Sequence, residues 1–235
     1  MAQDIWIGIE IENDRAQGWR FDGNTAQTGI SGLAADVLRD ISDTSALIIK
    51  DGPASQSVPA LVLPATFPFG ALHQDKPKGL LGHTARLRIA GALALNKAWD
   101  GVICLPMSDV THWCQVSADE VVSFQSALTP RLAQALGASE KADPEALADT
   151  MSRPERLSLH LRSATLKADP EAVAGHLVGA ELAAMRPYWL GQQVIVIGQN
   201  SLYSAAISAQ GVPVNMVDGQ DATREGLIAL RAAIG

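Results

Sequence analysis

The chain of 235 residues is acidic, with a formal net charge of −7, and 47% of its residues are hydrophobic while only 5% are aromatic. This length can bury a large core, and the composition is typical of an α/β protein rather than of a disordered one. The acidic balance and the lack of a basic stripe exclude a nucleic-acid partner. Neither a secretory leader nor an apolar run of membrane-spanning length is apparent, so we expect a cytoplasmic protein with no membrane partner.

Cysteine and histidine are sparse. Cys104 and Cys114 are ten residues apart and belong to no metal-ligand spacing, so we expect two reduced, buried thiols. The five histidines are scattered and form no metal-binding motif.

The first hundred residues predict strands and a hairpin before a helix. The run IWIGIEIE alternates apolar and polar residues, which indicates a strand, and the segment that follows it is the expected hairpin partner. Residues 51–68 are rich in Pro, Ser and Gly and predict mostly loop. In chain order, we expect strands at 4–12, 15–21, 46–50 and 60–63, and helices at 32–41 and 84–97.

A second set of strands and a hairpin begins near Asp100, and helices dominate after it. Asp143-Pro144 and Asp169-Pro170 have the N-cap and N1 residues of helix starts. We expect strands at 99–105, 111–116, 120–124, 194–197 and 214–217, and helices at 129–136, 143–150, 154–166, 170–185, 202–209 and 221–233.

The strand predicted at 194–197 ends at Gly198, and the next helix begins near Ser201. Glycine lets a ligand approach the backbone, and the free N–H groups and dipole of a helix N-terminus favour an anion. Most such junctions in α/β proteins bind nothing, so these residues alone leave a nucleotide site and a plain turn open.

Most of the chain resembles the 2-dehydro-3-deoxygalactonokinase family. Three segments of the chain resemble the C-terminal helix–strand–helix region of that family: the run GHLVGAE at 175–181, the strand ending at Gly198, and the helix from Ser201-Leu202 to Gly211. The block around Cys104-Leu105-Pro106, Trp113 and residues 122–129 is similar to the family's "LPGTHSKWV…F.T.MTGE" block, and residues 159–164 resemble its "LF.VRA" element.

The resemblance implies an α/β fold of the actin/hexokinase/Hsp70 (ribonuclease H-like) type, with two halves around a central cleft. We expect an N-terminal half at residues 1–98 and a C-terminal half with the adenosine region at 99–235. It also implies phosphorylation of the terminal 6-hydroxyl of 2-dehydro-3-deoxygalactonate, with ATP and Mg²⁺ as cofactors. The expected partners are therefore a small sugar acid and a nucleotide.

Individual residues receive roles from this resemblance and from their chemistry. Asp109 is the candidate general base, Arg162 the candidate substrate-binding residue and Glu10 the candidate metal ligand. Glu181 could also be an exposed residue on its helix, and an ordinary exposed helix position is the favoured interpretation for Arg162. Cofactor binding is expected at Asn13, Ser108, Gly179, Glu181, Gly198 and Ser201.

The segments that would bind phosphate depart from the family's pattern. In the opening "DWGTTNLR", Gly8 stands where the family has Asp, Glu10 where it has Gly, and Ile11 and Glu12 where it has hydroxyl residues. In the second loop, the family's Gly-Thr-His is replaced by residues 107–109, Met-Ser-Asp.

Phosphoryl transfer depends on stabilising a highly anionic centre, and carboxylates there oppose it. A catalytically impaired relative, a pseudokinase that binds a nucleotide or sugar acid or regulates a partner, is therefore the alternative function. Glu10, Glu12 and Asp109 could instead form a different metal site, or they could be solvated hairpin charges.

The chain also offers an apolar helix end at Met185, Tyr188 and Trp189. Such a patch indicates packing or a homodimer contact rather than a cofactor site. Trp113, on a predicted strand, is expected in the core.

Overall fold

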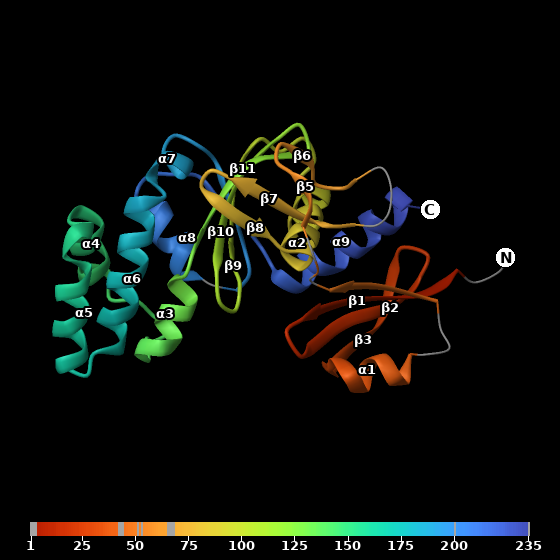
Figure 1. The fold of residues 1–235 in the computed structure, drawn as a ribbon, viewed down its shortest axis with the longest axis horizontal. Coiled ribbons are helices and arrows are strands. Elements are labelled where there is room, and N and C mark those ends of the chain that lie inside the picture. Colours follow the sequence, from red (N-terminus) through yellow and green to blue (C-terminus); the bar gives the residue numbers. More distant parts are fainter. Residues whose placement is uncertain are drawn as a thin grey trace. The chain divides into compact units, whose positions relative to one another are not determined.

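The computed structural model describes residues 4–41, 45–50, 52, 54–64, 69–199 and 201–234. The chain divides into two compact units (Figure 1). Unit 1 comprises residues 1–99, 117–123 and 217–235, and unit 2 comprises residues 100–116 and 124–216. The chain leaves unit 1 after Trp99, returns to it for residues 117–123 and returns again from residue 217. The expected halves at 1–98 and 99–235 stay a prediction.

Unit 1 begins with a four-stranded sheet in the order β3-β2-β1-β4. β1 (Ile5–Glu12) and β2 (Arg15–Asp22) form an antiparallel hairpin, β3 (Thr25–Leu33) extends it, and β4 (Ala46–Lys50) lies parallel to β1. The two-residue turn of the hairpin places Asn13 at φ 56°, a conformation that asparagine tolerates. The rings of Trp6 and Phe21 stack across the two strands at 4.1 Å. α1 (Ala34–Asp40) follows β3.

A smaller sheet in unit 1 has the order β5-β7-β8, formed by β5 (Ala54–Ser57), β7 (Ala71–Asp75) and β8 (Lys78–Leu81). The short strand β6 (Ala60–Leu61) pairs with the start of β11.

Two helices of unit 1, α2 (His83–Leu95) and α9 (Gly219–Ile234), pack closely although they lie far apart in the sequence. Glycines make this approach possible. A Cβ atom added to Gly91 would lie 1.7 Å from the carbonyl oxygen of Ala222, and one added to Gly226 would lie 2.3 Å from that of Leu87. Larger residues at these positions would therefore separate the helices.

Unit 2 contains most of a six-stranded sheet in the order β13-β12-β9-β10-β11-β6. β12 pairs in parallel with β9, and β10 pairs antiparallel with β9. The strands are β9 (Gly101–Pro106), β10 (Thr111–Ser117), β11 (Glu120–Ala127), β12 (Val194–Ile197) and β13 (Val214–Val217).

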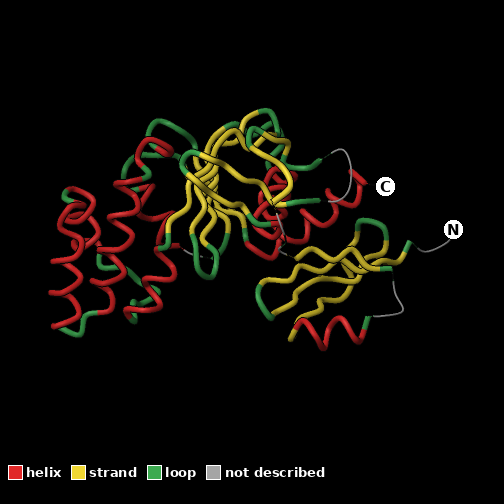
Figure 2. The backbone as a smooth tube through the Cα atoms, viewed as in Figure 1, coloured by secondary structure: helices red, strands yellow, loops and turns green. Residues whose placement is uncertain are grey.

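Helices form the rest of unit 2 and gather beside its sheet (Figure 2). The helix starts at Asp143 and Asp169 have the predicted N-caps: each carboxylate accepts a backbone hydrogen bond of 3.0 Å, from Glu145 and from Ala172 respectively. The helices are α3 (Thr129–Leu136), α4 (Pro144–Ser152), the 3₁₀ helix η1 (Pro154–Arg156), α5 (Leu157–Leu166), α6 (Pro170–Ala184), α7 (Arg186–Trp189) and α8 (Ser201–Ser208).

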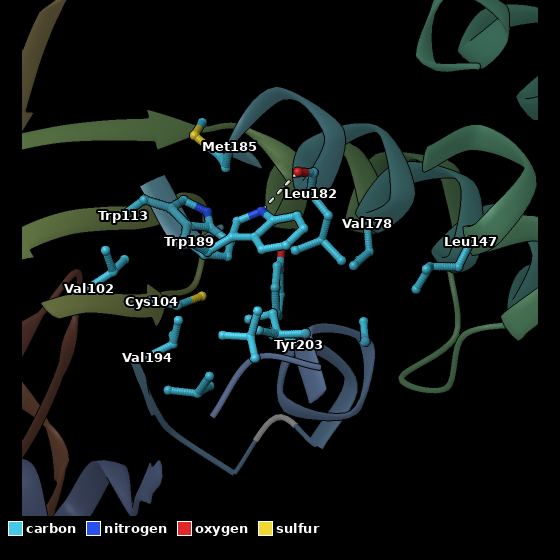
Figure 3. Close-up of a cluster of buried hydrophobic side chains, with 14 residues drawn as sticks. Val102, Cys104, Trp113, Leu147, Val178, Leu182, Met185, Trp189, Val194 and Tyr203 are labelled. Carbon is cyan, nitrogen blue, oxygen red and sulfur yellow. Dashed lines mark hydrogen bonds between the residues drawn. The ribbon is translucent and has the colours of Figure 1, made fainter. Parts of the chain in front are cut away.

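The core of unit 2 joins the sheet to α6, α7 and α8 (Figure 3). Trp113 and Trp189 are almost fully buried, and the indole nitrogen of Trp189 donates a 2.9 Å hydrogen bond to the carbonyl oxygen of Leu182. The prediction that Trp113 is a core residue is confirmed, as is the burial of both cysteines. Burial of Met185 and Trp189 in this core favours the packing interpretation of that patch, and a homodimer stays a prediction.

Most predicted elements after residue 84 are confirmed, and most errors lie before it. Residues 32–33 belong to β3 rather than to the predicted helix, and β3 itself was missed because its alternation is weak. The prediction also lacked β5, β7 and β8, whose few residues carry little periodic signal. Of the predicted loop at 51–68, residues 51, 53 and 65–68 lie outside the described residues.

Candidate functional site

A buried cluster of charges lies at the first hairpin of unit 1. Glu10 on β1 is 1% exposed, and its Oε1 lies 2.9 Å from Nε of Arg88 on α2. Nη2 of the same guanidinium donates to Oε2 of Glu12 at 2.9 Å. The second oxygen of Glu10 accepts hydrogen bonds from the Thr223 hydroxyl on α9 at 2.7 Å and from the Gln17 side chain at 3.1 Å. One guanidinium thus bridges two carboxylates of the same strand.

The protonation of this cluster reflects burial opposed by ion pairing. Burial raises the pKa of Glu10, while the charge of Arg88 and hydrogen bonds from Thr223 and Gln17 lower it. Burial would lower the pKa of Arg88, but the charges of Glu10 and Glu12 outweigh it, so this pKa is raised. The guanidinium therefore stays charged and holds both carboxylates.

A cavity of about 190 Å³ opens beside this cluster. Strands β1, β2 and β3 and helix α2 form its walls, which carry both signs of charge. Its lining residues are Glu10, Glu12, Arg15, Ala16, Gln17, Ser31, Gly32 and Arg88. Such a polar cavity suits a small polar ligand better than an apolar one.

Unit 2 contains a buried carboxylate whose resolved hydrogen-bond partners are all neutral. Glu181 on α6 is 4% exposed and accepts a hydrogen bond from the Trp113 indole at 2.7 Å and from the Tyr203 hydroxyl at 2.8 Å. Burial raises the pKa of Glu181, and hydrogen bonds from Thr129, Trp113, Tyr203 and Thr111 oppose this shift. Glu181 therefore links α6 to β10, α3 and α8.

Two cavities of unit 2 share Glu140 and Leu202 as lining residues. The smaller cavity, of about 120 Å³, is bounded by α3, α6 and α8 and includes Thr129 and Tyr203. The larger has a volume of about 530 Å³, within the range of small-molecule pockets. Its lining is mostly alanine and leucine, from the start of α4 and from α8: Glu140, Lys141, Ala142, Pro144, Leu147, Ala148, Leu202, Ala205, Ala206, Ala209 and Gln210.

Comparison with known proteins agrees with this architecture. A family model described as 2-keto-3-deoxy-galactonokinase matches residues 86–230, more than half of the chain. The chain belongs to the 2-keto-3-deoxy-galactonokinase family. A search of curated proteins gave no match.

Solved structures of distant relatives show the fold of this family member. It is similar over 97% of its length, and over 98% of the other chain, to a Sinorhizobium meliloti protein described as a "putative 2-dehydro-3-deoxygalactonokinase protein", with a TM-score of 0.81 and 17% identity. It is also similar to component A of (R)-2-hydroxyglutaryl-CoA dehydratase from Acidaminococcus fermentans, with a TM-score of 0.53, 11% identity and coverage of 97% and 98%.

A third similar structure is the activator of 2-hydroxyisocaproyl-CoA dehydratase from Clostridium difficile with bound ADPNP, with a TM-score of 0.52, 11% identity and coverage of 97% and 95%. These likenesses show that the 2-keto-3-deoxy-galactonokinase family member has the actin/hexokinase/Hsp70-like ATPase fold that we expected. None of the helices in the described part of the chain has the length and apolarity that a bilayer crossing requires.

Of the predicted cofactor-binding residues in this family member, two are packed inside unit 2. A Cβ atom added to Gly179 would lie 2.4 Å from the carbonyl oxygen of Leu147, so this glycine lets α6 and α4 approach closely. Glu181 is held in the network described above rather than exposed on the helix. These contacts give both residues a structural role, and nucleotide binding by them stays a prediction.

The other two C-terminal residues lie at the strand–helix junction. Gly198 has φ 122°, and a Cβ added there would meet nothing within 4 Å. The backbone at Gly198 is therefore open to an approaching group. α8 begins at Ser201, whose side chain lies outside what the structure describes.

Apart from the buried Glu10, the remaining predicted residues are at exposed or partly exposed positions of the two units. Asn13 is in the first hairpin turn of unit 1. In unit 2, Ser108 and Asp109 lie between β9 and β10, and the carboxylate of Asp109 pairs with Nη2 of Arg131 at 2.5 Å. Arg162 is exposed on α5. Asp109 belongs to unit 2 and Glu10 to unit 1.

The residues of the first hairpin do not fit the Mg²⁺ ion that the family implies. A magnesium site needs oxygen ligands that are free to coordinate. Here Glu10 already receives the charge of Arg88 and two hydrogen bonds, and Glu12 shares the same guanidinium. Within the described ranges, no group of three or more His, Cys, Asp or Glu residues could hold a metal ion.

Arg88, the cation at the centre of this cluster, was not predicted as a site residue. It lies on a correctly predicted helix, but the alternating charges of the first strand do not indicate that Glu12 pairs with an arginine 76 residues away. Arg86 was not predicted either; it is fully buried and donates to the carbonyl oxygens of Leu61, Val62 and Gly70. A basic residue within an otherwise apolar helix was the available signal for both.

Proposed function

We propose that this member of the sugar-acid kinase family binds a nucleotide in unit 2 and is impaired in phosphoryl transfer. The single observation that carries the proposal is the Glu10–Arg88–Glu12 cluster at the first hairpin. The resemblance of this hairpin to the family's opening motif implies that Mg²⁺ and the phosphates would be held here. A buried carboxylate and a second carboxylate at that place oppose an incoming phosphate.

The energetic argument follows from the chemistry of phosphoryl transfer. Catalysis of this reaction depends on positioning and on positive charges around the transferred group. Loss of one such electrostatic donor commonly lowers the rate by about 10²–10³-fold. Arg88, one of the two arginines that line the cavity at this hairpin, is already paired with two carboxylates, so we expect the loss to be at least of this size.

The larger cavity of unit 2 supports nucleotide binding. Its volume of about 530 Å³ and its alanine-rich walls suit the flat, apolar faces of a purine ring. Gly198, whose backbone is open to an approaching group, shortly precedes α8, and α8 lines this cavity. The Clostridium difficile relative was solved with bound ADPNP, which agrees with a nucleotide in this fold.

An active kinase is the second candidate, and the full-length likeness to the Sinorhizobium meliloti protein favours it. In that case ATP with Mg²⁺ would phosphorylate the 6-hydroxyl of 2-dehydro-3-deoxygalactonate. Asp109 would act as the general base and Arg162 would contact the sugar acid. We expect either activity in the cytoplasm, on small molecules, with a homodimer as the proposed assembly.

Isothermal titration with Mg-ATP, with and without 2-dehydro-3-deoxygalactonate, tests the proposal when ADP release is followed in the same samples. We expect saturable ATP binding with little or no substrate-dependent ADP release. Release of ADP at a rate typical of kinases would establish the second candidate, and no binding of either ligand would overturn both.

A variant pair locates the nucleotide. Ala205 is exposed on α8 and lines the larger cavity, whereas Ala135 is exposed on α3 and lines none of the described cavities. Ala205→Trp should weaken ATP binding at least tenfold, because the indole would occupy the cavity, and Ala135→Trp should leave it unchanged. Equal affinities in the two variants would place the nucleotide elsewhere.

A further inference from the structure

At the first hairpin, two carboxylates flank one positive charge as they would in a metal site, but the positive charge is the guanidinium of Arg88. Glu10 and Glu12 are two residues apart on β1, so their side chains lie on the same face of the strand. The Arg88 guanidinium is 2.9 Å from each of them and is itself 15% exposed at its side chain. The carboxylate of Glu10 is fully buried and that of Glu12 is 24% exposed.

Two carboxylates this close to one another need a positive charge between them, because their mutual repulsion grows as water is removed. A divalent cation coordinated by carboxylate oxygens is one solution, and a guanidinium fork is another. A guanidinium differs from a metal ion in that it is covalently attached, always charged and unable to dissociate. The guanidinium therefore offsets one of the two negative charges at every magnesium concentration.

Neighbouring groups reinforce the guanidinium in this role. Thr223 and Gln17 donate hydrogen bonds to Oε2 of Glu10, and Oε1 of Glu10 is paired with the Arg88 guanidinium. The cavity of about 190 Å³ beside the cluster leaves room for an ion if the guanidinium were removed.

We propose that Arg88 is a built-in replacement for a divalent cation at the first hairpin. In the wild-type protein, this hairpin binds no Mg²⁺. Glu10 and Glu12 become a divalent-cation site once the guanidinium is removed. This inference rests on the proposed function at one point, because both take the first hairpin as the place where phosphoryl transfer is impaired. It concerns metal binding by unit 1, whereas the nucleotide is proposed to bind unit 2.

Mn²⁺ titration followed by NMR tests this directly, because the paramagnetic ion broadens the amide signals of residues near it. In the wild-type protein we expect no selective broadening of β1 and β2. In Arg88→Ala, the signals around residues 10–17 should broaden selectively, with an Mn²⁺ affinity at least ten times that of the wild-type hairpin. Adding Glu12→Gln to Arg88→Ala should abolish the gain.

Two control variants separate this effect from a general gain of negative charge. Arg88→Lys keeps a cation on α2 and should bind no Mn²⁺ at the hairpin. Arg131→Ala removes an exposed guanidinium from the single carboxylate of Asp109 and should create no site. Selective broadening of β1 and β2 in the wild type, or none in Arg88→Ala, would overturn the proposal.

The outcome stays decisive if Arg88→Ala does not fold in metal-free buffer. Recovery of the folded spectrum with millimolar Mn²⁺ would then support the proposal, and failure of Mn²⁺ to recover it would overturn it. Substrate-dependent ADP release by the wild type would contradict the proposed function. If Mn²⁺ left the hairpin signals of a wild-type protein with such activity unchanged, the proposal that Arg88 replaces a divalent cation would still stand.

Discussion

The indole nitrogen of Trp113 on β10 lies 2.7 Å from a carboxylate oxygen of Glu181 on α6. The other carboxylate oxygen accepts the Tyr203 hydroxyl of α8 at 2.8 Å. A buried carboxylate held by neutral donors keeps part of the cost of its desolvation, and burial accordingly raises the pKa of Glu181. This relationship connects three elements of unit 2, of which α6 and α8 contribute residues to its smaller cavity.

Glu181→Gln should remove a pH-dependent part of the stability. Because the native pKa is raised above 4.5, the native state binds more protons than the unfolded state between 4.5 and the native pKa. The free energy of unfolding contributed by Glu181 therefore falls as pH rises through this interval. Urea denaturation at several pH values above 4.5 should show a smaller decline in Glu181→Gln than in the wild type. Glu145→Gln, at an exposed position, is the control, and equal pH dependence in all three proteins would contradict the prediction.

Arg88→Ala should strongly destabilise the protein in metal-free buffer. Removal of one partner of a buried ion pair commonly costs about 3–5 kcal/mol, because the other charge stays buried without compensation. Arg131→Ala breaks an exposed pair and should cost about 0–1 kcal/mol. Free energies of unfolding from urea denaturation would compare the two. Similar losses of unfolding free energy in the two variants would mean that the Glu10–Arg88 pair contributes no more to stability than an exposed pair.

Arg86→Met should destabilise unit 1 by about 2–5 kcal/mol, because the carbonyl groups of residues 61, 62 and 70 lose their donors. The guanidinium also lies over the Phe69 ring, with its carbon 4.8 Å from the centroid. Burial lowers the pKa of Arg86 to about 10, so it remains charged at neutral pH. Arg86→Lys should restore only part of the loss, since an ammonium cannot reach three carbonyls in a fork. Full restoration by lysine would argue that charge alone matters.

His176 should make the α4–α6 region sensitive to acid. Its Nδ1 lies 3.1 Å from the carbonyl oxygen of Ala146 and 2.8 Å from the Thr150 hydroxyl oxygen, so Nδ1 carries the proton and donates it. The Thr150 hydroxyl then donates to Nδ1 of His160 at 2.7 Å. Burial lowers the pKa of His176 below 6.5, and the charge of His160 acts in the same direction, while Asp149 and Asp143 oppose it.

The sign of this effect follows from proton binding. Below 6.5 the unfolded state binds more protons at this site than the native state, so the free energy of unfolding falls as pH falls. His176→Leu should weaken this decline between pH 6.5 and 5, as measured by urea denaturation. His73→Leu, at a partly exposed position of β7, is the control. An unchanged slope in His176→Leu would contradict the prediction.

Gly179→Ala distinguishes the packing role of this glycine from its predicted nucleotide contact. The added methyl group would lie 2.4 Å from the Leu147 carbonyl oxygen and would push α6 away from α4. We expect a loss of about 1–3 kcal/mol in stability, despite the better helix propensity of alanine. Gly29→Ala, whose methyl group would lie 4.0 Å from its nearest neighbour, should change little. Unchanged stability with weakened ATP binding would favour the nucleotide contact instead.

Local residue patterns were sufficient to predict most elements of the second half. The Asp-Pro pairs at 143–144 and 169–170 predicted helix starts, because an aspartate cap and a proline at the first helical position act within one turn. The family could also be inferred from short runs such as residues 175–181. These features depend on residues near one another in the chain, so no tertiary information is required.

Only the tertiary structure brought the decisive side chains together. Glu10 lies on the first strand and its partners lie on α2 and α9, and Trp113 meets Glu181 across 68 residues. No local period records such a pairing, because it depends on how the elements pack. The sequence thus determined the elements and the family, while packing decided that Glu10 is buried against a guanidinium and that Glu181 joins three elements of unit 2.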